Sequence, residues 1–143
     1  MNFVRGRLAA GTIELGEHHL ELPQELRASI RPDLGNSNSA EVLLGLRPED
    51  FVDARINADA KYPVLPSQVE IAEQLGPETF VYSRVPGVDV VEIGQRPVEL
   101  AGAVAARLDP RTTAEPGEQL ALAVNLTAAH LFDPASGESL LVQ

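Results

Sequence analysis

The fold is decided by the stretch Val98-Glu99-Leu100-Ala101-Gly102-Ala103-Val104-Ala105-Ala106-Arg107-Leu108. Its even positions are apolar or small, whereas its odd positions include Glu99 and Arg107. A period of two residues predicts a β-strand with one buried face, because successive side chains of a strand point to opposite faces. The same period recurs at Leu120, Leu122, Val124 and Leu126, so the chain is expected to be built mainly from strands.

Short apolar runs between turn residues continue this pattern along the chain, as in an all-β barrel or sandwich. The stretch Asp133-Pro134-Ala135-Ser136-Gly137 predicts a hairpin between 130–132 and 140–142, because proline presets φ and glycine supplies a positive φ. The last third of the chain is therefore expected to form a meander. The further predicted strands are Phe3 to Leu8, His19 to Leu22, Val42 to Leu46, Val69 to Glu73, Thr79 to Val85, and Ser139 to Val142.

Three segments depart from the strand pattern. Pro23 to Ala28 predicts a single helical turn with proline at its first position. Arg31 to Ala40 is polar and rich in turn residues, and Asp53 to Pro66 has no period, so both are expected to be long connections. With 143 residues the chain has the length of one domain, which we expect to span 1–143.

Charge and composition exclude several classes of function. The net charge of -10 repels phosphate backbones and anionic lipid, so we expect no binding of nucleic acid. Cysteine is absent, which rules out disulfides, thiol nucleophiles and thiolate metal ligands. No signal peptide or stretch of 18 apolar residues is present, so secretion and membrane spanning are not expected.

Residues for catalysis are scarce. A P-loop requires a lysine after a glycine-rich turn, and the one lysine of the chain, Lys61, lies in Ala60-Lys61-Tyr62. The neighbours His18 and His19 point to opposite faces of a predicted strand and cannot easily hold one metal together. We therefore expect no catalytic, cofactor-binding or metal-binding residue in this chain, which is not an enzyme by itself.

Three segments occur in a fixed order along the chain: Val42-Leu43-Leu44-Gly45-Leu46-Arg47-Pro48-Glu49-Asp50, Val69-Glu70-Ile71-Ala72-Glu73-Gln74-Leu75-Gly76-Pro77-Glu78-Thr79, and His130-Leu131-Phe132-Asp133 with Gly137. Together they resemble the C-terminal domain of the ATPase subunits of maltose-type ABC importers, also described as a transport-associated oligonucleotide-binding-like (OB-like) domain. The resemblance covers essentially the whole chain. It implies a mainly β fold: an OB-fold-like antiparallel barrel with additional strands and one short helical turn.

The resemblance also carries functional expectations. The nucleotide-binding motifs of that family are absent here, so ATP and Mg²⁺ are expected in an ATPase core that precedes Met1. This chain is then a non-catalytic regulatory and dimerisation domain of an importer for sugars or related polyols. Its expected partners are a second copy of itself, the ATPase domain, the permease subunits and a cytoplasmic regulator. Its expected location is cytoplasmic, peripheral to the inner membrane.

Five residues of these segments are the candidates for internal clamps or interface contacts: Arg47, Glu49, Glu73, Phe132 and Asp133. Arg47 follows a predicted strand and can hold a carboxylate bidentately, with Glu73 as a possible partner. Glu49 follows a proline and suits the positive end of a short helical turn. An alternative function is a small-ligand sensor for sugars or oxyanions, because related barrels bind ligands at loop or subunit junctions.

Overall fold

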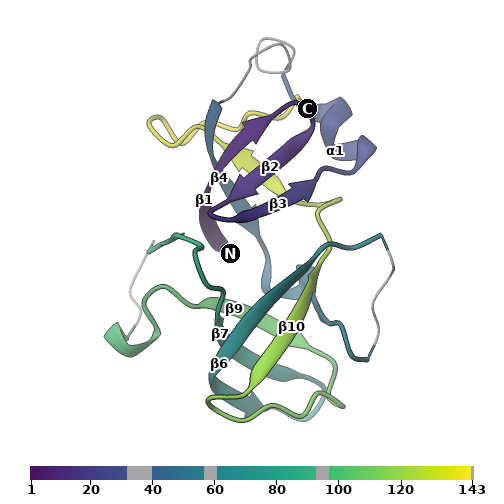
Figure 1. Ribbon diagram of the computed structural model, residues 1–143, viewed down its shortest axis with the longest axis vertical. Helices are drawn as coiled ribbons and strands as arrows, with labels where there is room; N and C mark the ends of the chain where they lie inside the picture. Colours follow the sequence, from purple (N-terminus) through teal and green to yellow (C-terminus); the bar gives the residue numbers. More distant parts are fainter. Residues whose placement is uncertain (32–39, 57–60, 93–96, 143) are drawn as a thin grey trace.

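The computed structural model describes residues 1–31, 40–56, 61–92 and 97–142 (Figure 1). Its strands form two antiparallel sheets, one above the other along the long axis of the molecule. The first sheet has the order β11-β4-β1-β2-β3, with β8 also paired to β1. It consists of β1 (Asn2–Ala9), β2 (Thr12–Leu15), β3 (His18–Glu21), β4 (Ala40–Leu46), β8 (Val90–Val91) and β11 (His130–Phe132).

The second sheet closes nearly into a barrel. It has the order β5-β10-β6-β7-β9, and its two end strands, β5 and β9, contact each other. The two edge strands therefore lie against each other instead of at opposite edges of an open sheet. The strands are β5 (Phe51–Asp53), β6 (Val64–Gln74), β7 (Thr79–Arg84), β9 (Val104–Leu108) and β10 (Gln119–Val124). Three short helical segments complete the described chain: α1 (Gln24–Ser29) and the 3₁₀ turns η1 (Pro48–Asp50) and η2 (Val98–Leu100).

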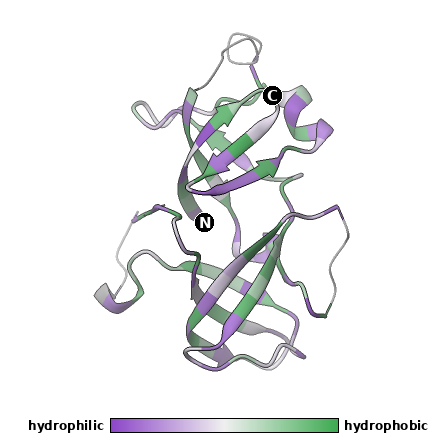
Figure 2. Ribbon diagram, viewed as in Figure 1, coloured by the Kyte–Doolittle hydropathy of each residue, from purple (hydrophilic) through white to green (hydrophobic). Residues whose placement is uncertain are grey.

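Alternating burial along the strands explains why these residues form sheets. In β7, Thr79, Val81 and Ser83 are buried while Phe80, Tyr82 and Arg84 face outward. Figure 2 shows the same alternation of hydropathy along several strands. The inward faces of both sheets contribute to one continuous hydrophobic cluster, which includes Leu44, Val81, Leu122 and Leu131. The predicted mainly β, OB-fold-like barrel with additional strands and a helical turn at α1 is confirmed.

Several details of the sequence prediction are wrong. The strand expected over 98–108 begins only at Val104, because η2 and the positive φ of Gly102 turn the chain before it. The last third is not a meander: β9 pairs with β7, β10 lies between β5 and β6, and β11 pairs with β4. β6 begins at Val64 rather than at Val69, which shortens the expected connection 53–66.

The predicted hairpin at 133–137 is confirmed. The Asp133 N–H donates to Glu138 O at 2.8 Å, and the Gly137 N–H donates to Asp133 O at 2.8 Å. Its second arm is not a full strand but two isolated bridges, Phe132 to Ser139 and Ile30 to Leu141. Most of the expected connection 31–40 and residues 57–60 of the second one lie outside the described residues.

Asn2 provides a polar link between the two sheets. Its side chain is 2% exposed, and its Nδ2 donates to the carbonyl oxygens of Leu46 at 3.1 Å and Ala105 at 2.9 Å. The Ala105 N–H donates back to Asn2 Oδ1 at 2.7 Å. One side chain of β1 thus satisfies backbone groups of β4 and β9. Among the described residues, no helix has the length and apolar character needed to cross a membrane.

Candidate functional site

The predicted site residues around η1 form a helical cap rather than a clamp. The Arg47 N–H donates to Asp50 Oδ2 at 2.9 Å, and Asp50 is only 7% exposed. The Asp50 carbonyl accepts a hydrogen bond from the Asn125 N–H at 2.8 Å, which ties this turn to the end of β10. Glu49 is exposed on the same turn. The acid that organises this turn is therefore Asp50.

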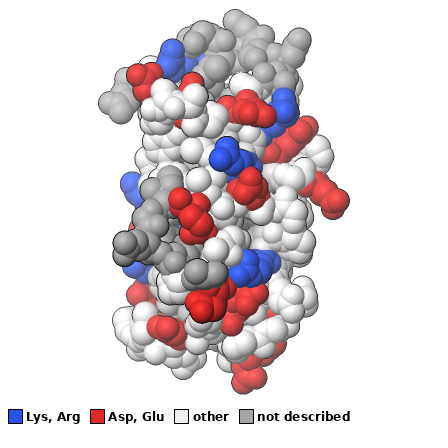
Figure 3. Space-filling view, turned by 90° about the vertical axis from the view of Figure 1, so that its left-hand side faces the viewer, with Lys and Arg blue, Asp and Glu red and all other residues white. Residues whose placement is uncertain are grey.

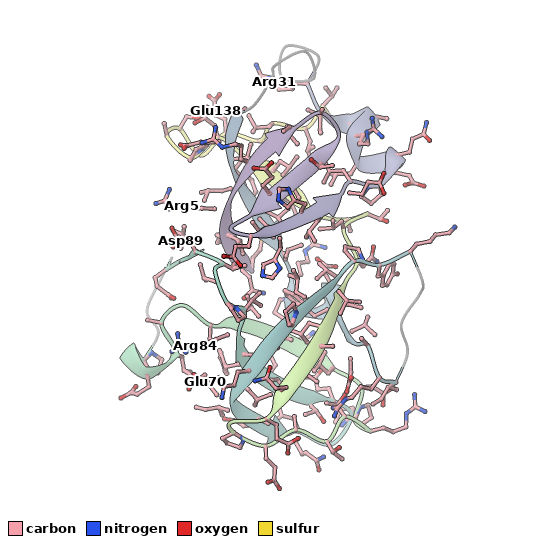
Figure 4. All side chains as sticks on the ribbon, in the orientation of Figure 1. Arg5, Arg31, Glu70, Arg84, Asp89 and Glu138 are labelled. Carbon is pink, nitrogen blue, oxygen red and sulfur yellow. The ribbon has the colours of Figure 1, made fainter. Side chains whose placement is uncertain are left out.

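The proposed pairing of Arg47 with Glu73 is not formed. In the described ranges no ion pair joins these two residues, and Glu73 lies exposed on β6 opposite Phe80. An arginine that does pair with a carboxylate of β6 is Arg84 on β7, whose Nε donates to Glu70 Oε1 at 2.7 Å (Figure 4).

Arg84 also holds the turn before β9. Its Nη1 donates to Ala101 O at 2.6 Å and its Nη2 donates to Glu99 O at 2.9 Å. This guanidinium therefore connects β6, β7 and η2. Sequence analysis did not single out Arg84, because the residues around it contain no motif that predicts a hydrogen bond to a carbonyl 15 or more residues away.

Glu73 belongs to an outward surface of the second sheet that we call the β6–β7 face. The register pairs Ile71 with Tyr82 and Glu73 with Phe80, so the four side chains share one side, and Arg107 lies opposite Phe80 on β9. The rings of Phe80 and Tyr82 meet edge to face at 5.3 Å. Ile71 is 36% exposed. The β6–β7 face thus combines apolar and aromatic surface with both signs of charge.

Phe132 packs within the first sheet. Its ring centroid lies 5.9 Å from that of Phe3 and 6.0 Å from that of His130. The cluster covers Gly45, where an added Cβ would lie 3.1 Å from Phe132 Cε2 and 2.8 Å from Met1 Sδ. Phe132 and His130 remain half-buried.

Asp133 organises the hairpin that follows Phe132. Its Oδ1 accepts the N–H groups of Ala135 at 2.7 Å and Ser136 at 3.2 Å. An aspartate that bonds its own downstream backbone stabilises a turn. The geometry around Asp133 is accordingly that of a turn-forming residue.

An ion pair between a buried carboxylate, Asp53, and a largely exposed arginine, Arg55, lies at the end of β5. Asp53 is 1% exposed and accepts hydrogen bonds from Arg55 Nε at 3.1 Å and Arg55 Nη2 at 3.0 Å. Burial opposes ionisation of this carboxyl, but the hydrogen bonds and charge of Arg55 outweigh it and hold the pKa of Asp53 below its ordinary value. Arg55 Nη2 also donates to Thr113 O at 3.0 Å. The pair fastens β5 to the segment after β9.

Two cavities lined by described residues open at the surface. The first, of about 420 Å³, is lined by charged residues that largely neutralise each other: Arg5 pairs with Asp89 at 3.2 Å (Figure 4), and Arg7 pairs with Glu41 at 3.4 Å. The second, of about 480 Å³, lies between the two sheets and is called the inter-sheet cavity below. It is lined by Glu21, Leu22, Pro23, Gln24, Glu25, Lys61, Tyr62, Pro63, Val124, Leu126 and Thr127.

The histidines have structural partners. His18 Nε2 lies 2.9 Å from Pro86 O, and His19 Nδ1 lies 3.5 Å from Glu14 Oε1. The part of the chain that the structure describes contains no group of three His, Cys, Asp or Glu that could hold a metal ion. On the face shown in Figure 3, acidic and basic side chains are interspersed.

Comparison with known proteins shows which proteins this chain is similar to. Residues 1–51 match the model of the MalK OB fold domain. The oligosaccharides import ATP-binding protein MsmX of Bacillus subtilis (strain 168) is 29% identical over 134 residues, which is 93% of this chain and 32% of that protein. The sn-glycerol-3-phosphate import ATP-binding protein UgpC of Chromohalobacter salexigens is 38% identical over 90 residues, 63% of this chain and 21% of that protein.

A solved structure resembles the fold along its length. A crystal structure of the cytoplasmic molybdate-binding protein ModG covers 93% of this chain and 96% of its own, with a TM-score of 0.63 and 13% identity. The chain spans about a third of the length of MsmX. The resemblance inferred from the sequence is confirmed: the chain is similar to the ATP-binding proteins of sugar importers, and its residues 1–51 are similar to the MalK OB fold domain.

Proposed function

We propose that this chain is the regulatory and dimerisation domain of the ATP-binding subunit of an importer for sugars or related polyols. The observation that carries the proposal is similarity over 93% of the chain to an import ATP-binding protein of which it spans only a third. The transported compounds named for the relatives, oligosaccharides and sn-glycerol-3-phosphate, support the substrate class.

The proposed role depends on contacts and not on a reaction. ATP and Mg²⁺ bind in the ATPase part of the parent protein, since the single lysine, Lys61, is not part of a P-loop. The proposed binding partners of the domain are a second copy of itself, the ATPase domain, the permease subunits and a cytoplasmic regulator. The complex lies at the cytoplasmic side of the inner membrane.

The β6–β7 face is the surface that we assign to the second copy. Exposed Ile71 and the paired rings of Phe80 and Tyr82 supply apolar contact area, as interface cores require. Glu73 and Arg107 lie on the same face, and Arg107 Nε also pairs with Glu78 Oε2 of its own chain at 2.9 Å. Two copies related by a two-fold axis can place Glu73 of each against Arg107 of the other as a second carboxylate partner.

The absence of cysteine allows a direct test of this dimer. In Ile71→Cys, a short bismaleimide reagent should join two copies through the β6–β7 face. The matched control is Glu17→Cys, at the exposed turn between β2 and β3 of the first sheet, which should remain uncrosslinked. A chain that stays monomeric by light scattering up to its solubility limit, with no crosslinking at position 71, would refute the dimerisation role.

A second candidate function is small-ligand sensing, which the molybdate-binding protein of similar fold and the two cavities favour. An oxyanion is the poorer ligand, because Arg5 and Arg7 in the first cavity are already paired with carboxylates. A thermal-shift panel of sugars, polyols and oxyanions tests this function. A ligand at 100 times its Kd should stabilise the fold by about 2.7 kcal/mol. A flat response to the whole panel would eliminate it.

A further inference from the structure

The inter-sheet cavity is built by elements of both sheets. Glu21 ends β3 and Glu25 lies in α1, which belong to the upper half of Figure 1. Tyr62 precedes β6 and Val124 ends β10, and Figure 1 draws these two strands in the lower half. The Val124 N–H donates to Pro63 O at 2.9 Å and joins the two lower segments. A cavity of about 480 Å³ is within the usual range of small-molecule sites, about 300–1,000 Å³.

The lining has an apolar floor and a polar rim. Leu22, Val124 and Leu126 are at most 4% exposed and form the floor, beside half-buried Tyr62. Such a floor suits the C–H face of a ring or a carbon chain. The rim carries hydrogen-bonding groups of several kinds, namely the side chains of Glu21, Gln24, Glu25, Lys61 and Thr127.

The two cavities differ in whether their charged side chains have partners within the chain. Glu21 and Glu25 are exposed, and neither side chain forms a hydrogen bond or ion pair with another described residue. Arg5 and Arg7 of the first cavity, in contrast, have their charges matched by Asp89 and Glu41. The acceptor capacity of Glu21 and Glu25 is therefore available to a ligand.

We propose that the inter-sheet cavity binds a neutral polyhydroxylated compound, a saccharide or polyol, and this rests on the second candidate function. An anion would meet the two carboxylates of the rim. An organic cation can only donate hydrogen bonds, so it would leave the donor groups of Gln24 and Tyr62 without an acceptor. A hydroxyl group avoids both conflicts, because it donates to Glu21 or Glu25 and accepts from Gln24 or Tyr62. Hydrogen bonds to a carboxylate are roughly twice as strong as those between neutral groups.

Binding there has a structural consequence. Because the ligand contacts β3 and α1 on one side and the ends of β6 and β10 on the other, it connects the two sheets. The bound state therefore resists separation of the sheets, and the midpoint of thermal unfolding rises with ligand concentration.

Isothermal titration calorimetry with glucose, maltose and glycerol tests the site, with molybdate and spermidine as the charged comparisons. At least one neutral compound should bind, and Tyr62→Ala and Glu25→Gln should each weaken it tenfold or more. Gln119→Ala and Glu115→Gln are the controls at exposed positions outside the cavity, and both should bind as the unchanged chain does. Two independent variants keep the test valid should one of them fail to fold.

Three results would overturn the proposal, and they are distinguishable. Saccharide binding that Tyr62→Ala and Glu25→Gln leave unchanged would place the ligand elsewhere, so the cavity assignment would fail while ligand sensing would stand. Tighter binding of spermidine or molybdate than of every neutral compound would refute the ligand class. No binding of any saccharide or polyol would remove both this site and its sensing function, and the proposed dimerisation role would be untouched.

Discussion

Asn2 and Ala105 exchange two hydrogen bonds across a sequence separation of 103 residues. The side-chain amide of Asn2 substitutes for a neighbouring strand, since it satisfies both backbone groups of Ala105 at 2.9 and 2.7 Å. The contact lies where the two sheets meet, and its amide is almost completely buried. Buried backbone groups without partners are costly, so this side chain has a large effect on stability.

The first prediction concerns this amide. Asn2→Ala removes the hydrogen bonds to the N–H and C=O of Ala105 and to the carbonyl oxygen of Leu46. An unsatisfied buried group costs about 1–3 kcal/mol, so we expect the free energy of unfolding to fall by about 2–4 kcal/mol. Urea unfolding followed by circular dichroism measures the change. Exposed Gln119→Ala serves as the control and should change stability by at most about 0.5 kcal/mol. Equal stability of the Asn2 variant and the unchanged chain would show that the link between the sheets is unimportant.

A second prediction follows from Asp53. Its folded-state pKa is lowered, so its stabilising effect is present above the unfolded pKa of about 3.9 and is lost as the pH falls through the folded pKa. Asp53→Asn should therefore reduce stability by about 1–3 kcal/mol at pH 7, as for a hydrogen bond to a charged group. The difference between the two proteins should shrink as the pH falls below about 4.

The chain contains a matched control for this pair. Asp109 and Arg111 repeat the same spacing and geometry, with Nε to Oδ1 at 3.0 Å, but in an exposed setting. The pKa of Asp109 is also lowered, through its hydrogen bonds with Arg111. Water and salt screen this pair, so Asp109→Asn should alter the pH dependence less than Asp53→Asn does. Chemical denaturation between pH 3 and pH 7 measures both effects. If Asp109→Asn altered the pH dependence of stability more than Asp53→Asn, the stabilising role that we assign to the ion pair of Asp53 would be wrong.

A third prediction concerns the close approach of two loops. Gly16 has φ +61°, and a Cβ added there would overlap the carbonyl oxygen of Gly87. Gly117 also has a positive φ, +90°, but no neighbouring atom within 4 Å of an added Cβ. Gly117→Ala should cost only the conformational strain, about 1 kcal/mol, while Gly16→Ala should cost clearly more. Thermal unfolding of both variants measures the difference, and equal costs would mean that the two loops separate without penalty.

A fourth prediction concerns a buried chain of hydroxyl groups in the second sheet. Ser83 Oγ donates to Ser67 Oγ at 2.6 Å, and Ser67 Oγ donates to Leu120 O at 2.7 Å. Ser67→Ala removes both bonds and leaves the Ser83 hydroxyl buried without its acceptor, whereas Ser83→Ala removes only the first bond. Ser67→Ala should therefore lower stability by about 1–3 kcal/mol, and Ser83→Ala by about 1 kcal/mol or less. Urea unfolding measures both changes. If Ser83→Ala lowered the free energy of unfolding more than Ser67→Ala, our assignment of Ser83 as the donor and Ser67 as the acceptor would be wrong.

The candidate residues show which contacts local sequence can predict and which it cannot. Asp133 and Phe132 were identified from a motif, and their contacts are local or cross-strand: a turn for the first, and packing over Gly45 for the second. The proposed partner of Arg47 was wrong, because a guanidinium on a strand end has many carboxylates within possible reach. Arg84 and Asn2, which connect distant elements, had no local signature at all.

The sequence by itself determined that the chain is mainly β, where several strands and the hairpin at 133–137 lie, and to which family it is related. Alternation of apolar and polar residues and the turn residues Pro134 and Gly137 act over a few positions, so they can be recognised locally. Only the tertiary structure decided the strand order, the closure of β5 against β9 and the placement of the inter-sheet cavity. Strand pairing depends on which distant faces bury each other, and that choice minimises the free energy of the whole chain rather than of any one segment.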